Sequence, residues 1–232
     1  GSWGGVKGHN ALANTALAVL TYLAHGEYPG APSPYAKDFG PVLQKAVEYI
    51  ISHTNINGSK TRMRGSDGNE YAFLIASYAL CEAYGMTKNP NCKEAAEACL
   101  ERIIHGQSST GGWDYKVNPA STRDDISFAG WALQALKAGK MAGLKPDGLN
   151  ECIRKAVACL RSRNFKGSGF SYIAKQRNVT GLTATGCLAM QLLGYGSDMV
   201  VAKSLNYMRG WKPTFEAKEL GRPGQKPGSC PQ

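Results

Sequence analysis

The chain has 232 residues, 43% of them hydrophobic and 19% charged, with 28 glycines and a net charge of +10. This composition favours a mostly helical globular protein with a sizeable core. An integral membrane protein is not expected, because no apolar run approaches the roughly 20 residues that span a bilayer. A nucleic-acid partner is not expected either, since the basic residues come without a recognisable reading module.

One pattern occurs four times along the chain: an apolar helix that ends at a glycine, a short linker, a second amphipathic helix, and a turn of glycines and an aromatic residue. Apolar residues recur at three and four residues within each helix, which predicts helical hairpins. The closing glycines are Gly26, Gly85, Gly139 and Gly194. The first helices are expected at 13–26, 69–85, 124–139 and 179–194. The second helices are expected at 41–53, 91–105, 148–163 and 198–209.

The repeats predict an all-α fold, with one domain over residues 1–210 that is built one hairpin at a time. The hairpins are expected at about 9–54, 69–105, 124–163 and 179–210. Glycines let the turns between them bend tightly, as in GGWDY at 111–115 and GSGFSY at 167–172. Residues 211–232 carry four prolines and three glycines and are predicted to form a linker or an extended edge.

The cysteines and histidines indicate no metal site and no cofactor. The seven cysteines are Cys81, Cys92, Cys99, Cys152, Cys159, Cys187 and Cys230. Their number is odd and no Cys-x-x-Cys spacing is present, so we expect buried thiols that pack as small hydrophobic side chains. The four histidines, which share no metal-ligand spacing, are His9, His25, His53 and His105.

The positive charge is concentrated between Lys137 and Arg177, where ten basic residues stand against two acids and carry +8 of the net +10. A solvated outer face explains this stretch most simply. A patch of this kind also attracts diphosphate groups and anionic lipid surfaces.

Several stretches carry a family resemblance: WGG at 3–5, ALCEAYG at 79–85, GGWDY at 111–115, DISFAGWALQAL at 125–136 and LTATGCL at 182–188. Over roughly residues 3–210 the chain resembles the prenyltransferase/squalene-oxidase repeat proteins of bacteria, which are relatives of terpene cyclases and protein prenyltransferases. The resemblance implies an alpha-alpha toroid, in which first helices line an inner ring and second helices form an outer ring. A full toroid has six hairpins, so four hairpins imply either an open arc or a segment whose closing repeats lie elsewhere. The resemblance also suggests a bacterial protein, exported or associated with the envelope.

The family's catalytic residues are only partly matched. The cyclase acid motif Asp-x-Asp-Asp is nearest to residues 122–125, where Asp124 and Asp125 keep two carboxylates and the first is missing. The zinc ligands of the prenyltransferases are an Asp-x-Cys pair and a later histidine. Asp125 keeps the first position, whereas Ser127 and Thr183 replace the cysteine and the histidine. Aspartates just before a helix also act as caps for its free N–H groups.

Three hypotheses about function follow. The first is a non-catalytic module that binds an apolar ligand or a protein segment on the concave surface of its first helices. The residues expected to line that surface are Tyr71, Trp113, Tyr115, Asp125, Phe128, Trp131 and Thr183. The second is an isoprenoid enzyme with altered acid chemistry, in which Asp124 is the proton donor. The third is a structural segment of a larger envelope protein. The incomplete motifs favour a protein without catalytic activity, and the oligomeric state is left open.

Overall fold

The computed structural model describes residues 1–4, 10–66, 70–174 and 176–211. Within these ranges the chain forms eight α-helices, one five-residue π-helix and one two-stranded antiparallel sheet, so the predicted all-α fold is confirmed. None of these helices has both the length and the apolar character needed to cross a bilayer. Some residues used above lie outside the described ranges: Gly5, His9, Asn69, Cys230 and the tail 212–232.

Each expected helix is present, with its ends shifted by a few residues. The first helices of the hairpins are α1 (Ala11–Ala24), α3 (Tyr71–Thr87), α5 (Ile126–Ala142) and α7 (Thr180–Leu192). The second helices are α2 (Ala36–His53), α4 (Pro90–His105), α6 (Leu149–Cys159) and α8 (Met199–Met208). The π-helix η2 (Leu160–Asn164) continues α6 directly.

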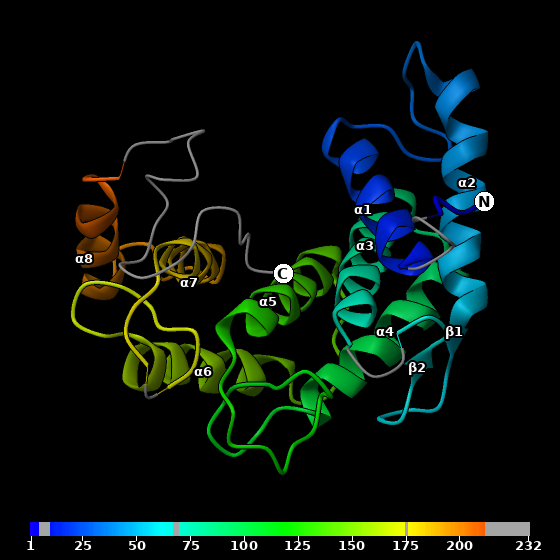
Figure 1. Cartoon of the computed structure of the whole chain (residues 1–232). Coiled ribbons are helices and arrows are strands. Elements are labelled where there is room, and N and C mark those ends of the chain that lie inside the picture. The colour runs from blue at the N-terminus through cyan, green and yellow to red at the C-terminus, as the bar shows by residue number, and fades with distance from the viewer. Residues whose placement is uncertain (5–9, 67–69, 175, 212–232) are drawn as a thin grey trace.

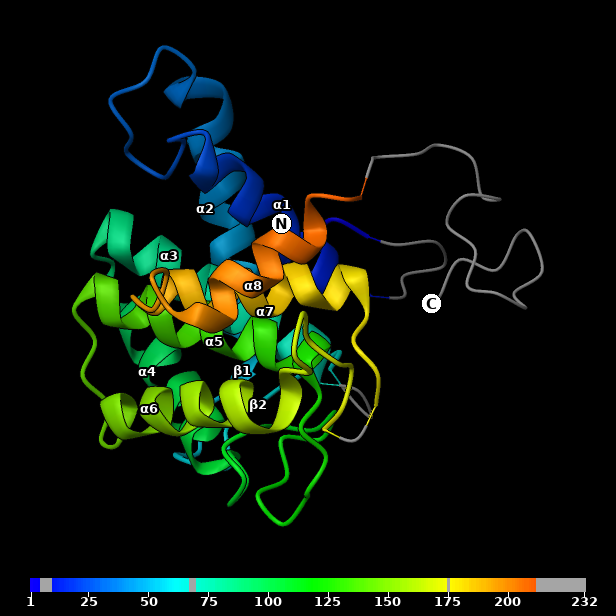
Figure 2. The ribbon, with the colours of Figure 1, turned by 90° about the vertical axis from the view of Figure 1, so that its left-hand side faces the viewer.

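The helices form two layers that follow the order of the chain. In the first layer α1 packs against α3, α3 against α5, and α5 against α7. Each second helix packs against the first helix of its own hairpin, and α2, α4 and α6 contact one another in that order. Figure 1 shows α1, α3, α5 and α7 as a curved row with the second helices outside it. Figure 2, turned by 90°, shows α6 running beside α5 on one side of this row.

The core lies along the first layer and between the two layers. Helix α3 is surrounded by α1, α4 and α5, so its small and apolar residues are buried nearly all round, and α5 is enclosed in the same way. Over most of the length of these two helices, the half-buried residues form one stripe that faces away from the second helices. We call the surface formed by this stripe the inner-layer face: Tyr71, Tyr78 and Glu82 of α3, with Ser127, Trp131 and Gln134 of α5.

Two of the four predicted closing glycines do not end their helices. Gly26 and Gly194 follow α1 and α7 with φ of 88° and 91°, as expected for a left-handed stop. The prediction was wrong for Gly85 and Gly139, because α3 and α5 continue past them. At Gly139 a Cβ atom would lie 2.4 Å from Leu100 Cδ1, so this glycine lets α4 approach α5 closely. Its role is packing between helices.

A short β-hairpin joins α2 to α3 and was not predicted from the sequence. Strand β1 (Thr54–Asn55) pairs with β2 (Arg62–Met63), with Thr54 opposite Met63. Each strand has only two residues, too few for the alternating pattern by which strands are recognised.

The described cysteines are buried and form no disulfide, which confirms the prediction of packed thiols: Cys81, Cys92, Cys99, Cys152, Cys159 and Cys187. Burial raises the pKa of Cys92, Cys99 and Cys152 to about 12, because the thiolate would lose its hydration. These thiols therefore stay protonated and contribute to packing.

Candidate binding site

The glycine-aromatic turns place large side chains between the hairpins. Trp113 is fully buried, and its Nε1 donates a hydrogen bond of 2.8 Å to the backbone oxygen of Ile103 in α4. Phe170 is fully buried in the corresponding turn of the next repeat, and a Cβ atom at Gly186 of α7 would lie 2.5 Å from its ring. Trp113, which was expected to line a ligand surface, is thus enclosed by protein.

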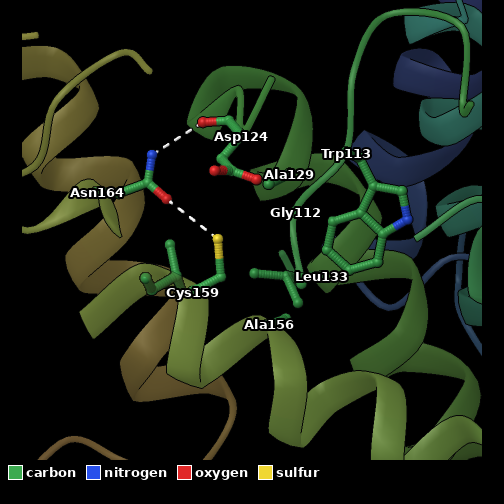
Figure 3. Close-up of a pocket in the computed structure, with 10 residues that line it drawn as sticks. Gly112, Trp113, Asp124, Ala129, Leu133, Ala156, Cys159 and Asn164 are labelled. Carbon is green, nitrogen blue, oxygen red and sulfur yellow. Dashed lines mark hydrogen bonds between the residues drawn. The ribbon is translucent and has the colours of Figure 1, made fainter. Parts of the chain in front are cut away.

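Asp124 lies in the loop before α5 and is 2% exposed. Arg163 Nε and Thr110 Oγ1 donate hydrogen bonds to its two carboxylate oxygens, one to each. Asn164 Nδ2 donates to the backbone oxygen of Asp124 at 2.9 Å. Figure 3 shows Asn164 between Asp124 and Cys159, whose Sγ donates to Asn164 Oδ1 at 3.6 Å. Because both carboxylate oxygens already accept hydrogen bonds from protein groups, these contacts support an anchoring role for Asp124.

The preceding repeat has an ion pair at the same place. Glu70 comes directly before α3, and Arg102 lies in the last turn of α4. Arg102 Nη2 and Nη1 donate to Glu70 Oε1 and Oε2 at 2.8 and 3.3 Å, and both side chains are less than a tenth exposed. We call the pairs Glu70–Arg102 and Asp124–Arg163 the hairpin clasps. Each clasp ties the end of a second helix to the start of the first helix of the same hairpin.

Asp125 is fully buried and caps α5. Its Oδ1 accepts hydrogen bonds from the backbone N–H groups of Ser127 and Phe128 at 3.1 and 3.2 Å, which satisfies two free donors of the first turn. Its Oδ2 accepts from Arg123 Nη2 and Nε at 3.0 and 3.3 Å. The capping role expected for this aspartate is confirmed, so Asp125 contributes to a site through the side chains that it holds.

Ser127 links Asp125 to Tyr71. Ser127 Oγ donates to Asp125 Oδ1 at 2.6 Å. Since a serine hydroxyl has a single proton, the hydrogen bond of 2.5 Å between the Tyr71 and Ser127 oxygens uses the proton of Tyr71. Burial raises the pKa of Tyr71 to about 12, and the charge of Asp125 adds to this shift. Tyr71 therefore stays a neutral donor at pH values where a free tyrosine ionises.

Arg123 stands between two tyrosines that occupy equivalent positions in successive turns. Its guanidinium carbon lies 4.9 Å from the ring centre of Tyr115 and 5.2 Å from that of Tyr172, within the range of cation–π contacts. Nε and Nη2 are engaged with Asp125, and Nη2 also lies 3.5 Å from the Tyr115 hydroxyl. No described residue accepts a hydrogen bond from Nη1, and the side chain is 37% exposed.

These side chains form one group at the N-terminal ends of α3 and α5. We call it the rim cluster: Tyr71, Tyr115, Arg123, Asp125, Ser127 and Tyr172. The ring centres of Tyr71 and Tyr115 are 5.7 Å apart. The cluster borders the inner-layer face, because Tyr71 and Ser127 belong to both.

The rim cluster brings together three of the residues expected to line a ligand surface, Tyr71, Tyr115 and Asp125. Phe128 lies behind them, fully buried, with its ring centre 5.1 Å from that of Tyr71. Trp131 is half-buried on the inner-layer face, one helical turn beyond Ser127.

Sequence reasoning missed three members of the rim cluster as binding residues: Arg123, Ser127 and Tyr172. A signal was present for Tyr172 in the repeat register, since tyrosines stand two residues after Trp113 and after Phe170.

No three histidine, cysteine, aspartate or glutamate side chains gather as metal ligands in the described ranges. Thr183, at the position of a zinc-binding histidine in the family resemblance, is fully buried. Its Oγ1 donates to the backbone oxygen of Val179 at 2.8 Å and accepts from the backbone N–H of Phe170 at 3.0 Å. Thr183 therefore holds the turn before α7 against that helix.

Two hollows lie elsewhere in the described structure. A cavity of about 10 Å³ beside Asp124, Trp113 and Cys159 has room for about one water molecule (Figure 3). A hollow of about 260 Å³ lies between Ile56 and the glutamates of α4. Neither is an enclosed apolar pocket of the roughly 300–1,000 Å³ that is usual for small-molecule ligands.

Comparison with known proteins yields a likeness in fold. No protein family and no curated protein matches the sequence. Among solved structures, the fold is similar to that of a polysaccharide lyase, with a TM-score of 0.57 and 13% sequence identity. The match covers 87% of this chain and 59% of the lyase chain, so this chain spans about three fifths of the length of the lyase.

Proposed function

We propose that this protein is a non-catalytic binding module that holds a polysaccharide chain across its inner-layer face. The observation that carries the proposal is the mixture of rings and polar groups along that face. Tyr71, Tyr78 and Trp131 supply aromatic rings, and Glu82 and Gln134 supply polar groups beside them. Sugar rings present apolar faces and hydroxyl edges, and half-buried aromatic, carboxyl and amide side chains complement both.

The ligand class follows from two further observations. A small apolar molecule is less favoured, because the two hollows described above do not enclose such a ligand. Likeness in fold to a polysaccharide lyase favours a polysaccharide over a protein segment. The order of the two helix layers supports an alpha-alpha toroid arrangement, in which the inner-layer face belongs to the inner ring.

An isoprenoid enzyme has less support, although the sequence resembles the prenyltransferase/squalene-oxidase repeat proteins. A proton donor needs a carboxyl oxygen directed at the substrate. The oxygens of Asp124 are engaged with Arg163 and Thr110, and those of Asp125 with Arg123 and the start of α5.

The proposal is tested by calorimetric titration of the chain with soluble polysaccharides, for the unchanged protein and for two variants. Trp131→Ala removes a ring from the inner-layer face and is expected to weaken binding about tenfold or more, as truncation of a central aromatic does. Met199→Ala is the control, because Met199 is 65% exposed on α8, in the other layer, and loses apolar surface as well.

Equal affinity of the two variants would contradict the placement of the ligand on the inner-layer face. Absence of binding to every polysaccharide, with binding to an unfolded polypeptide, would replace the proposal by the protein-segment hypothesis.

A further inference from the structure

We propose that Arg123 recognises a carboxylate on the bound chain, so that the ligand is an acidic polysaccharide. This inference rests on the function proposed above and adds to it the charge of the ligand and the residue that reads it.

The guanidinium of Arg123 is held in place before any ligand arrives. Two hydrogen bonds to Asp125 Oδ2 fix one edge, and the rings of Tyr115 and Tyr172 lie 4.9 and 5.2 Å from the guanidinium carbon. Asp125 is itself fixed, since its Oδ1 accepts hydrogen bonds from α5. A side chain that is already ordered loses little conformational freedom on binding, which favours affinity.

The remaining end of the guanidinium, Nη1, has no partner among the described residues. Nη1 carries two N–H donors, has no acceptor among the described residues, and belongs to a side chain that is 37% exposed. Because arginine only donates, its partner on the ligand must be an acceptor. A carboxylate is the acceptor that gains most there, since a charge-assisted hydrogen bond is roughly twice as strong as a neutral one.

Two other arginines show what distinguishes this arrangement. Arg102 also lies over an aromatic ring, 4.3 Å from that of Phe73, but it is 6% exposed and both of its terminal nitrogens are bound to Glu70. Arg154 is 67% exposed on α6 and pairs with Glu151 of the same helix. Arg123 is held in a fixed geometry, as Arg102 is, and it is also exposed to solvent, as Arg154 is.

The place of Arg123 agrees with a ligand on the inner-layer face. Its partner Asp125 is joined to Tyr71 through Ser127, and Ser127 and Tyr71 lie on that face. Trp131 follows Ser127 by four residues on α5, which is about 6 Å along the helix axis. A chain that contacts Trp131 therefore passes close to the rim cluster.

The test compares polygalacturonate with the same polymer after complete methyl esterification, which removes the charge and keeps the sugar chain. The unchanged protein is expected to bind the acidic form about tenfold more tightly, the gain from one hydrogen bond to a charged group. Arg123→Gln should lose this preference and keep its affinity for the ester. Arg154→Gln removes the same charge from α6 and should behave as the unchanged protein, which separates recognition from the net charge of +10.

Equal binding of both polymers by the unchanged protein, with no effect of Arg123→Gln, would overturn the inference and leave the proposed function standing. Failure to bind either polymer would overturn the inference, and the proposed function would fall with it only if the other soluble polysaccharides also failed to bind. Tighter binding of poly-glutamate than of polygalacturonate, dependent on Arg123, would overturn the polysaccharide as ligand. If Arg123→Gln does not fold, Arg123→Lys is the second variant. Lysine keeps the positive charge but lacks the planar guanidinium group. An undiminished preference of this variant for the acidic polymer would count against recognition by the guanidinium.

Discussion

The two middle hairpins, α3–α4 and α5–α6, are closed by clasps of the same kind but of different construction. In the α3–α4 hairpin both partners are buried: Arg102 is 6% and Glu70 8% exposed, and two nitrogens bind two oxygens. In the α5–α6 hairpin the Asp124 side chain is 1% exposed, but the Arg163 side chain is 37% exposed and binds through Nε. Although the two ion pairs differ in burial and geometry, in both repeats the acidic residue before the first helix binds an arginine at the end of the second helix and so holds the hairpin closed.

The clasps also differ in the helix that presents the arginine. Arg102 belongs to a regular last turn of α4, whereas Arg163 belongs to the π-helix that continues α6. The next residue, Asn164, donates to the backbone oxygen of Asp124 and accepts at its own backbone oxygen from Ser171. In the α5–α6 hairpin both Arg163 and Asn164 therefore bind Asp124, so we expect the loss of any one of these contacts to lower the free energy of unfolding less.

The largest effect is expected where the α3–α4 clasp is broken. Arg102→Ala removes the buried partner of the Glu70 carboxylate and leaves it only Arg62, whose Nη1 lies 3.7 Å from Glu70 Oε1 and whose side chain is 70% exposed. We therefore expect the free energy of unfolding to fall by about 3 kcal/mol. Denaturant titration measures this fall. Replacing both partners by apolar residues, Glu70→Leu with Arg102→Met, should restore most of the loss, because no charge is then left buried. A loss below about 1 kcal/mol for Arg102→Ala would contradict the account of this clasp.

A smaller effect is expected at the other clasp. Asp124→Asn keeps an acceptor for Thr110 or Arg163, and Arg163 reaches water, so we expect a loss of about 1–2 kcal/mol in the same denaturant titration. Polysaccharide affinity should stay unchanged. Lost affinity with unchanged stability would mean that Asp124 serves a ligand and that the comparison of the clasps is mistaken.

Two glycines at corresponding places in these hairpins should respond in opposite directions. Gly139→Ala would bring a Cβ atom 2.4 Å from Leu100 Cδ1, and we expect a loss of about 1 kcal/mol after the gain in helix propensity is deducted. At Gly85 a Cβ atom would lie 3.5 Å from the Cβ of Ala142, an ordinary contact, so Gly85→Ala should stabilise by up to about 1 kcal/mol. Thermal unfolding of both variants checks the pair, and a shift of the same sign in both would refute the packing role of Gly139.

The smallest effect concerns pH and the rim cluster. The pKa of Tyr71 is raised from 10 to about 12, chiefly by burial, so the folded protein keeps a proton that the unfolded chain loses above pH 10. Stability contributed by Tyr71 is therefore present below pH 10 and is lost as the pH rises toward 12. The free energy of unfolding of the Tyr71→Phe variant should fall less steeply with pH over this range than that of the unchanged protein. Absorbance titration of phenolate checks the assignment, because the variant should lack a tyrosine that ionises late.

The helical hairpins were predictable because their apolar spacing is local, and the packed cysteines followed from the same spacing. The helix ends were less predictable. Gly85 and Gly139 resemble glycines that end a helix, but whether they do so depends on the residues that pack against them from neighbouring helices. The clasp between Glu70 and Arg102 joins residues 32 apart, which no local pattern reveals. It was detectable only by comparing repeats, since an acid precedes the first helix and an arginine ends the second in both middle hairpins.

The candidate site was predicted in part, for a related physical reason. Tyr71, Tyr115 and Asp125 were selected by their positions in the repeat, and they do lie together. Trp113 and Phe128 were selected as aromatic residues, and burial shows that their size serves the core. Side-chain type alone does not separate these two uses, because the choice depends on which side of the helix or turn stays uncovered.

The most direct test of the central claim is hydrogen–deuterium exchange of the chain with and without polygalacturonate. The account predicts slower exchange in the first turns of α3 and α5 and in the turns that carry Tyr115 and Tyr172, with α4, α6 and α8 unchanged. Slower exchange confined to α4, α6 or α8 would contradict the claim that the ligand lies on the inner-layer face.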